Sequence, residues 1–210
     1  MHVGHRHAYN LKCPGTGINF SNLTRSAIYS LVFGEEVAAK STSKTAARNC
    51  YPGSLDNKKV AGKIVICVTD DQNITRNIKK LIVQDAGAMG MILIEKENID
   101  VPFDAGLFPF IEVGNLEGYQ ILKSIKSTKK PTATILTTTE IPRYRPTPIV
   151  ASFSSRGPSS LTENILKPDV MAPGVSILAA LIPKKENVPI GKKPSMFGLK
   201  SGTSMACPHV

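Results

Sequence analysis

The sequence predicts an α/β fold built in two parts, and three segments carry that prediction. Residues 60–68 read VAGKIVICV, a run nearly continuous in β-branched residues that is typical of a strand buried on both faces. Residues 74–86 repeat apolar residues at helical spacing, which predicts an amphipathic helix after that strand. Residues 141–148 hold three prolines in eight positions, which disfavours helix and indicates an extended linker. We therefore expect a mixed domain before the linker and a second part after it.

The helix predicted at 74–86 has one apolar side and one basic side. The apolar stripe is formed by Ile74, Ile78, Leu81 and Ile82. The residues expected on the other side are Arg76, Lys79 and Lys80. Gly87 is placed to end the helix, because glycine readily adopts the left-handed conformation found after a helix C-terminus.

Shorter elements are predicted along the rest of the chain. Before the linker these are strands at 89–94, 108–113 and 132–139 and a helix at 116–125. After the linker they are a strand at 149–153, a turn at 154–158, an apolar stretch at 175–182 and a basic loop at 183–194. The acids of the first part form no pattern suited to acid and base catalysis, and we interpret most of them as surface charge. They are Asp70, Asp71, Asp85, Asp100 and Asp104.

The composition argues against two classes of partner. The formal net charge is +10, yet the lysines occur as scattered pairs, and the chain has no tryptophan and only 6% aromatic residues. Neither a basic stripe nor a base-stacking platform for nucleic acid is predicted. The most apolar region, 170–183, is interrupted by Pro173 and Gly174, so no stretch reaches the roughly 18 to 20 apolar residues of a membrane helix. We expect no nucleic-acid partner and no membrane partner.

Cysteines and histidines give no indication of a metal or cofactor site. The four cysteines include no C-x-x-C pair, which argues against a zinc ribbon or a thioredoxin-like site. His2, His5 and His7 lie in an N-terminal segment that resembles no signal peptide, and no further metal ligand is indicated beside them. Three N-x-S/T triplets would accept glycans if the protein is exported. They begin at Asn19, Asn22 and Asn73.

A candidate nucleophile lies near the end of the chain. Gly202 allows a tight turn before Ser204, and Pro208 is tolerated only in a first helical turn, so this pattern places a serine at a helix start. Free backbone amides and the positive end of the helix dipole at such a position can stabilise an oxyanion during acyl transfer. Serine is also among the commonest helix caps, so spacing alone leaves a purely capping role open.

Three stretches resemble the subtilisin-like serine proteases, and in particular their plant branch. They are SGTSMACPHV at 201–210, VASFSSRGPS at 150–159 and ILKPDVMAPGVSILAA at 165–180. Their order and separation also fit the family. The resemblance implies that Ser204 is the acylated nucleophile, that polypeptides are the substrates of the full-length protein, and that the protein is secreted to the cell wall space.

The part before the linker resembles the protease-associated domain that plant subtilases insert ahead of the nucleophile. The likeness rests on ARNCYPGSLDNKKVAGKIVIC at 47–67 and on the strand ending at Ile94. It implies a disulfide between Cys50 and Cys67, a role in substrate access and the possibility of self-association. The implied architecture is a partial subtilisin-like parallel-sheet catalytic domain joined to a mixed, mainly β protease-associated domain. The implied boundaries are 1–28 for an unmatched leader and lead-in segment, 29–140 for the protease-associated domain, and 141–210 for the linker and the truncated catalytic part.

The resemblance also identifies what these 210 residues lack. Subtilisins order their triad Asp, His, Ser, with an oxyanion-hole Asn between the His and the Ser, and here those three partners would precede residue 1. His209 does not replace the histidine, because it follows Ser204 by five residues on the same helix, whereas a general base approaches from another element. We expect this chain alone to be inactive and its C-terminal third to be unstable by itself.

Two other interpretations remain open on the sequence. In the first, the domain at 29–140 is a protein-interaction module and the serine is vestigial. In the second, the motif around Ser204 is a variant nucleophile elbow of an α/β-hydrolase, whose acid and histidine follow the serine in sequence. The stretches at 150–159 and 165–180 argue against the second interpretation, because they belong to the subtilisin-like pattern.

Overall fold

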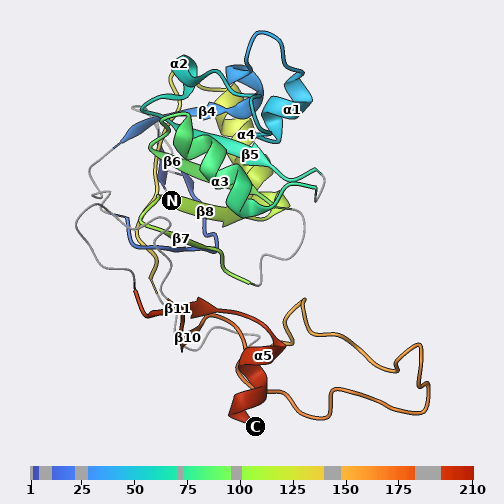
Figure 1. The fold of residues 1–210 in the computed structure, drawn as a ribbon. Helices are drawn as coiled ribbons and strands as arrows, with labels where there is room; N and C mark the ends of the chain where they lie inside the picture. Colours follow the sequence, from blue (N-terminus) through green and yellow to red (C-terminus); the bar gives the residue numbers. More distant parts are fainter. Residues whose placement is uncertain are drawn as a thin grey trace. The chain divides into compact units, whose positions relative to one another are not determined.

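The chain forms two compact units, residues 1–140 and 141–210. The computed structural model describes residues 2–4, 11–21, 28–70, 73–95, 101–139, 148–182 and 195–210. Figure 1 shows the helices and strands of each unit, coloured along the sequence. Within the described ranges, none of the helices has the length and apolarity that a membrane crossing needs.

A mixed sheet forms the centre of the first unit. Its seven strands within the described residues lie in the order β2, β1, β9, β4, β5, β6, β8. The pairs β4 with β5, β5 with β6 and β6 with β8 are parallel, whereas β9 pairs antiparallel with both β1 and β4. The strands are β1 His2–Gly4, β2 Leu11–Lys12, β4 Tyr29–Phe33, β5 Ile64–Val68, β6 Gly90–Ile94, β8 Phe110–Val113 and β9 Thr132–Thr134. A separate parallel pair joins β3 Ile18–Asn19 and β7 Asp104–Gly106. The chain is thus α/β with a mixed sheet.

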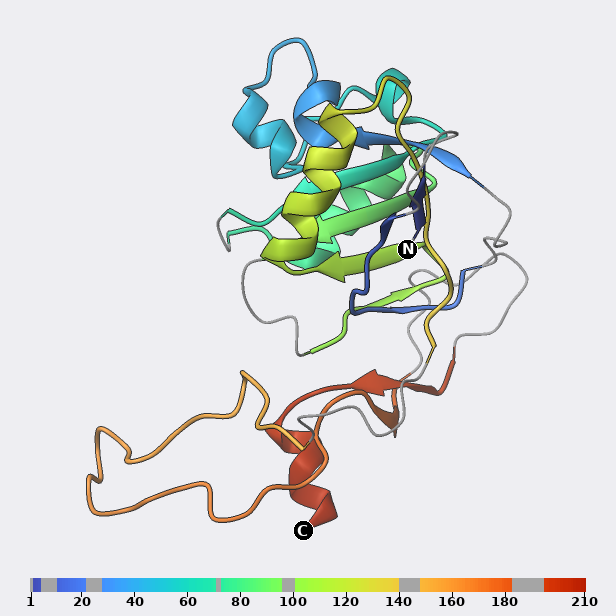
Figure 2. The same cartoon turned by 180° about the vertical axis from the view of Figure 1, so that it is seen from behind.

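Helices cover both faces of this sheet. Figures 1 and 2 show α3 Arg76–Asp85 on one face and α4 Asn115–Lys126 on the other. Successive residues of β5 accordingly enter two different cores: Val65 packs in the cluster that contains Val83 of α3, while Ile64 lies in the cluster that contains Ile121 of α4. All five residues of β5 are buried, which confirms the predicted strand covered on both faces. Smaller elements are η1 Gly34–Val37, α1 Lys44–Arg48 and α2 Asn57–Val60.

The strand predicted from residue 60 begins four residues later. Residues 57–60 form α2, whose N-terminus is capped by the Asp56 carboxylate accepting the Lys58 N–H at 3.0 Å. Gly62 then adopts a left-handed φ of +74°, which turns the chain into β5. A local cap and turn therefore interrupt a stretch that its β-branched composition alone assigns to one strand.

Helix α3 confirms the predicted helix but not its predicted orientation. Thr75 caps its N-terminus through Oγ1, and Gly87 at φ +82° follows its last turn, as expected. Lys79, however, is fully buried, whereas Ile78 is 42% exposed. The Lys79 ammonium donates to the Val68 carbonyl at 2.7 Å and to Thr69 Oγ1 at 3.4 Å. Because the carboxyl end of β5 supplies these acceptors, the buried face of α3 is rotated from the apolar stripe toward Lys79.

In the second unit, the described strands form an antiparallel pair. Strand β10 Ile177–Ala180 pairs with β11 Phe197–Lys200, and β11 is followed by α5 Thr203–Ala206 and η2 Cys207–His209. The parallel sheet expected in 141–210 does not occur among the residues described there; the parallel strands lie in the first unit. The strand predicted at 149–153 is also wrong, because the Ser154 N–H bonds to the Ala151 carbonyl and closes a turn. An apolar run without a neighbouring strand to pair with does not form a ladder.

Candidate active site

Ser204 lies at the second position of α5 and its side chain is exposed. The helix begins after Gly202, whose φ of +152° and ψ of 165° belong to a region that residues with a Cβ atom rarely adopt. A Cβ atom there would meet nothing closer than 3.8 Å, so the backbone conformation, and not lack of space, requires glycine. The serine therefore emerges at the mouth of a short helix, as the sequence pattern predicts.

The first turn of α5 leaves backbone donors available. Met205 and Ala206 both donate their N–H groups to the Gly202 carbonyl, at 3.0 and 3.3 Å, and Cys207 donates to Thr203. Among the described residues, no backbone carbonyl accepts the N–H of Thr203 or Ser204. Two adjacent amides beside an exposed hydroxyl form an arrangement that can bind a developing oxyanion.

The turn that precedes α5 is held by the segment before β10. Gly202 donates its N–H to the Gly174 carbonyl at 2.8 Å, and Ser201 Oγ accepts the Ser176 N–H at 2.9 Å. Gly174 is buried, and a Cβ atom there would lie 3.0 Å from the Gly202 carbonyl oxygen and 3.1 Å from the Ala206 Cβ. The two segments are therefore in direct contact. The sequence pattern contains Ser201 and Gly174, but nothing in their spacing shows that they meet.

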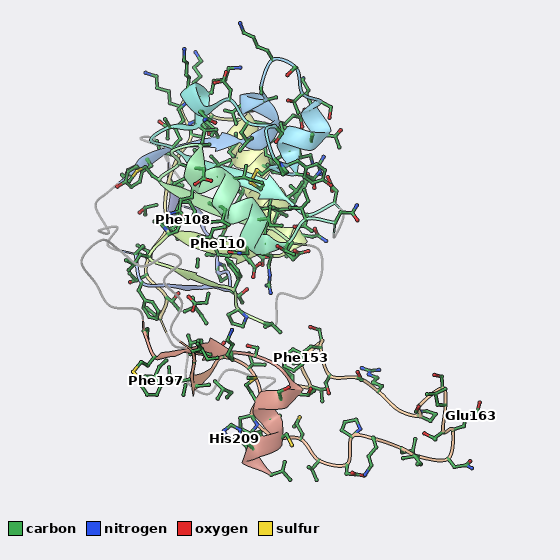
Figure 3. The ribbon with its side chains drawn as sticks, viewed as in Figure 1. Phe108, Phe110, Phe153, Glu163, Phe197 and His209 are labelled. Atoms are coloured by element: carbon green, nitrogen blue, oxygen red, sulfur yellow. A yellow bond between two sulfur atoms is a disulfide. The ribbon has the colours of Figure 1, made fainter. Side chains whose placement is uncertain are left out.

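His209 does not contact the Ser204 hydroxyl. Its side chain lies beside the C-terminal helical segment (Figure 3), where Nδ1 forms a hydrogen bond of 2.7 Å with the Met205 carbonyl. Pro208 is in the first turn of η2, where its missing N–H costs no hydrogen bond. In the described part of residues 141–210 no other histidine is present, so this unit supplies no general base next to Ser204.

Cys50 and Cys67 form a disulfide in the first unit. It joins the segment after α1 to the next-to-last residue of strand β5, and both half-cystines are fully buried. Cys13 is a buried free thiol whose pKa is raised by desolvation, and Cys207 is an exposed free thiol.

The asparagines of the three glycosylation triplets lie in different surroundings, and one of them is outside the described residues. Asn73 is exposed, two residues before the N-cap of α3. Asn19 is in β3, and Asn22 lies outside the described residues.

Among the three histidines near the N-terminus, His2 is in β1, while His5 and His7 lie outside the described residues. No group of three His, Cys, Asp or Glu able to hold a metal ion occurs among the residues that were described.

An ion pair between the partly exposed Arg76 and the fully buried Glu112 in the first unit was not predicted from the sequence. Arg76 donates from Nη1 to both carboxylate oxygens of Glu112, at 2.9 and 3.1 Å, and to the Val101 carbonyl at 3.0 Å. The guanidinium also lies 5.6 Å from the centroid of the Phe103 ring. The one sequence signal is an acid inside the apolar strand β8, FIEV, which in a strand covered on both faces implies a partner.

Burial raises the pKa of Glu112 from 4.5 to about 7, against the opposing effect of Arg76, and the nearby Glu95 raises it further. The folded state therefore binds the proton of the Glu112 carboxyl group more tightly than the unfolded chain does. The free energy of unfolding should therefore fall by about 3 kcal/mol as the pH rises from about 4.5 to 7, and then level off. Urea unfolding of the chain followed by circular dichroism across this range tests the prediction. Glu112→Gln should remove the slope, whereas Glu36→Gln, at an exposed site, should retain it. A pH-independent midpoint in the wild type would contradict the prediction.

Comparison with known proteins shows that most of the chain matches one protein family. The model of the subtilase family matches residues 24–210. The CO(2)-response secreted protease of Arabidopsis thaliana is 42% identical over 202 residues, which cover 96% of this chain and 26% of that protein. Subtilisin-like protease SBT5.1 of the same organism is 41% identical over 202 residues, which again cover 96% of this chain and 26% of that protein. Subtilisin-like protease SBT4.4, also of Arabidopsis thaliana, is 43% identical over 185 residues, which cover 87% of this chain and 24% of that protein. This chain thus spans about a quarter of the length of these relatives.

A solved aminopeptidase from Aneurinibacillus sp. strain AM-1 overlaps with 64% of this chain and 29% of its own, at 15% identity and a TM-score of 0.33. That likeness is too weak to indicate a shared fold.

Proposed function

Since the chain belongs to the subtilase family of serine proteases, we propose that Ser204 is the nucleophile of a peptide-bond hydrolase of which this chain forms part. One observation carries the proposal: an exposed hydroxyl at the start of a short helix, beside two backbone amides that no described carbonyl occupies. A buried side chain or a helix interior at this position would give the hydroxyl no access to a substrate.

The proposed reaction uses these groups in acyl transfer. Ser204 Oγ attacks the carbonyl carbon of a peptide bond, and its proton passes to a histidine base supplied by the full-length protein. The tetrahedral intermediate carries negative charge on the carbonyl oxygen, which the backbone amides of Thr203 and Ser204 stabilise. The amine then leaves with the transferred proton, and water hydrolyses the ester on Ser204. Polypeptides are accordingly the substrate class that we propose.

We assign the first unit to a protease-associated domain at 29–140. Its support is a sheet with a core on each face, a buried disulfide and the sequence likeness at 47–67. Strands β1 and β2, which precede residue 29, belong to the same sheet. This domain is the proposed site of self-association, which light scattering of the chain would test: a strictly monomeric protein at all concentrations would exclude that role. Export to the extracellular space, with a glycan on the exposed Asn73, completes the proposal.

The isolated chain is proposed to be inactive. The family resemblance implies that the Asp, His and oxyanion Asn lie outside these 210 residues, and the His209 ring bonds to the Met205 carbonyl. Removal of the base and its orienting acid leaves only the oxyanion donors and substrate binding, which lowers turnover by about a million-fold in subtilisin.

A fluorophosphonate probe tests both statements in one experiment. In the full-length protein that includes the family's Asp and His, the probe should attach to the tryptic peptide that contains Ser204, because only an activated serine reacts rapidly. The isolated chain under the same conditions should remain unlabelled. Mass spectrometry that located the adduct on another residue of the full-length protein would refute the assignment of Ser204. Rapid labelling of the isolated chain at Ser204 would refute its inactivity.

A further inference from the structure

We propose that Ser201 is a positioning residue that holds the nucleophile turn in place, an inference that rests on the proposed role of Ser204. The Ser201 hydroxyl oxygen accepts the Ser176 N–H at 2.9 Å. This bond ties the turn before α5 to a segment 25 residues earlier in the chain. It is a contact between a side chain and a backbone group, so it depends on the residue type at 201.

The strand pairing shows why a side chain is needed at this point. In the antiparallel pair of β10 and β11, Ile177 lies opposite Lys200. Residues 176 and 201 are the next opposed positions, and the ladder ends there because the chain turns away at Gly202. Ser201 Oγ provides the acceptor for the Ser176 N–H at that position. The Gly202 N–H then bonds to the Gly174 carbonyl at 2.8 Å, so two consecutive contacts hold the turn.

The backbone conformation of Ser176 makes its position more dependent on the hydrogen bond to Ser201 Oγ. Ser176 has a φ of 54°, a left-handed conformation that costs a residue with a side chain about 1 to 2 kcal/mol. Its own hydroxyl is buried and has no hydrogen-bond partner in the described structure. The side chain of Ser176 therefore does not stabilise the turn, and the polar contact that residue 176 makes with the turn is the bond from its N–H to Ser201 Oγ.

Displacement of this segment would be transmitted to α5. Gly174 fits so closely against Gly202 and Ala206 that a single added carbon atom would crowd both. Helix α5 has only four residues and is too short to be stable without external contacts. Its position, and with it that of the Ser204 hydroxyl, therefore depends on the contacts at 174–176. In a reaction of this kind, a misplacement of about 1 Å can cost a factor of about 100 in rate.

The test compares variants of residue 201 in the full-length protease with a fluorogenic peptide substrate. Ser201→Ala should lower kcat by about 10-fold to 100-fold with little change in KM, because substrate contacts remain while the nucleophile is displaced. Ser201→Thr retains the hydroxyl and should restore most of kcat. Ser159→Ala is the matched control: Ser159 Oγ also accepts a backbone N–H, from Leu161 at 3.2 Å, but in an exposed turn of the same unit. This control should behave as the wild type.

Titration with the fluorophosphonate probe counts the competent molecules in each preparation, so kcat is expressed per active site and partial misfolding does not mimic the effect. Ser201→Cys, in which sulfur is a weaker acceptor, should give an intermediate kcat and serves if the alanine variant does not fold. An unchanged kcat in the alanine or cysteine variant, or a threonine variant as impaired as alanine, would overturn the inference. Loss of the Ser204 assignment itself would appear differently, as probe attachment elsewhere in the wild type.

Discussion

On the proposed function, replacing Ser204 by alanine in the full-length protein is expected to lower kcat for peptide hydrolysis by about a million-fold, to the rate that substrate binding and the oxyanion donors supply alone. The loss should appear in kcat and not in KM, since in the proposed mechanism the hydroxyl attacks the reacting carbonyl and contributes little to ground-state binding. Ser204 is exposed in a four-residue helix, so the substitution opens no cavity in a core. The folded state should therefore be retained.

Steady-state kinetics on a peptide substrate would measure this effect, with Ser159→Ala as the control at an exposed turn of the same unit. Circular dichroism of both variants would verify the fold. A Ser204→Ala protein that kept more than about one thousandth of the wild-type kcat would leave the chemistry to another residue, since loss of a triad nucleophile costs far more than that.

The second large effect concerns stability. Replacing both Cys50 and Cys67 by alanine should lower the free energy of unfolding of the first unit by about 3 kcal/mol, because the cross-link closes a loop with a sequence separation of 17 residues. The thermal midpoint should fall by about 10 °C for a chain of this size. Both half-cystines are fully buried, so removing their sulfur atoms also leaves a small packing defect.

Thermal unfolding with and without a reducing agent separates these contributions. Reduced wild-type protein should lose most of the same stability, whereas Cys207→Ala, which removes the exposed free thiol, should unfold with the wild-type midpoint. Equal midpoints for the oxidised wild type and the double variant would show that the disulfide does not stabilise the folded state.

Local sequence patterns were sufficient to predict the helices and strands that interactions between nearby residues determine. The helices at 76–85 and 115–126 and the strands at 64–68 and 90–94 follow from apolar spacing, caps and β-branched runs, and all were predicted within a few residues. The strand predicted at 149–153 does not form, because a strand depends on a partner elsewhere in the chain. Its apolar residues favour a strand, yet a strand forms only when another segment offers backbone partners.

For the candidate site, the sequence pattern predicted a turn and a helix start at Ser204 but not the contacts that hold the turn. Gly202 and Pro208 restrict the backbone by their own chemistry, so their meaning is visible without a structure. The contact between Ser176 and Ser201 depends on the register of β10 against β11, which no local pattern specifies. The same holds for Glu112 and Arg76, which are 36 residues apart in sequence.

The sequence by itself determined the family, the position of the candidate nucleophile at a helix start, and the alternation of strands and helices in the first unit. Tertiary structure alone decided which charged side chains are buried: Lys79 lies in the interior because the carboxyl end of β5 provides its acceptors, and Glu112 because Arg76 reaches it. The physical reason is that a backbone preference acts within a few residues, whereas burying a charge requires partners that only the folded chain brings together.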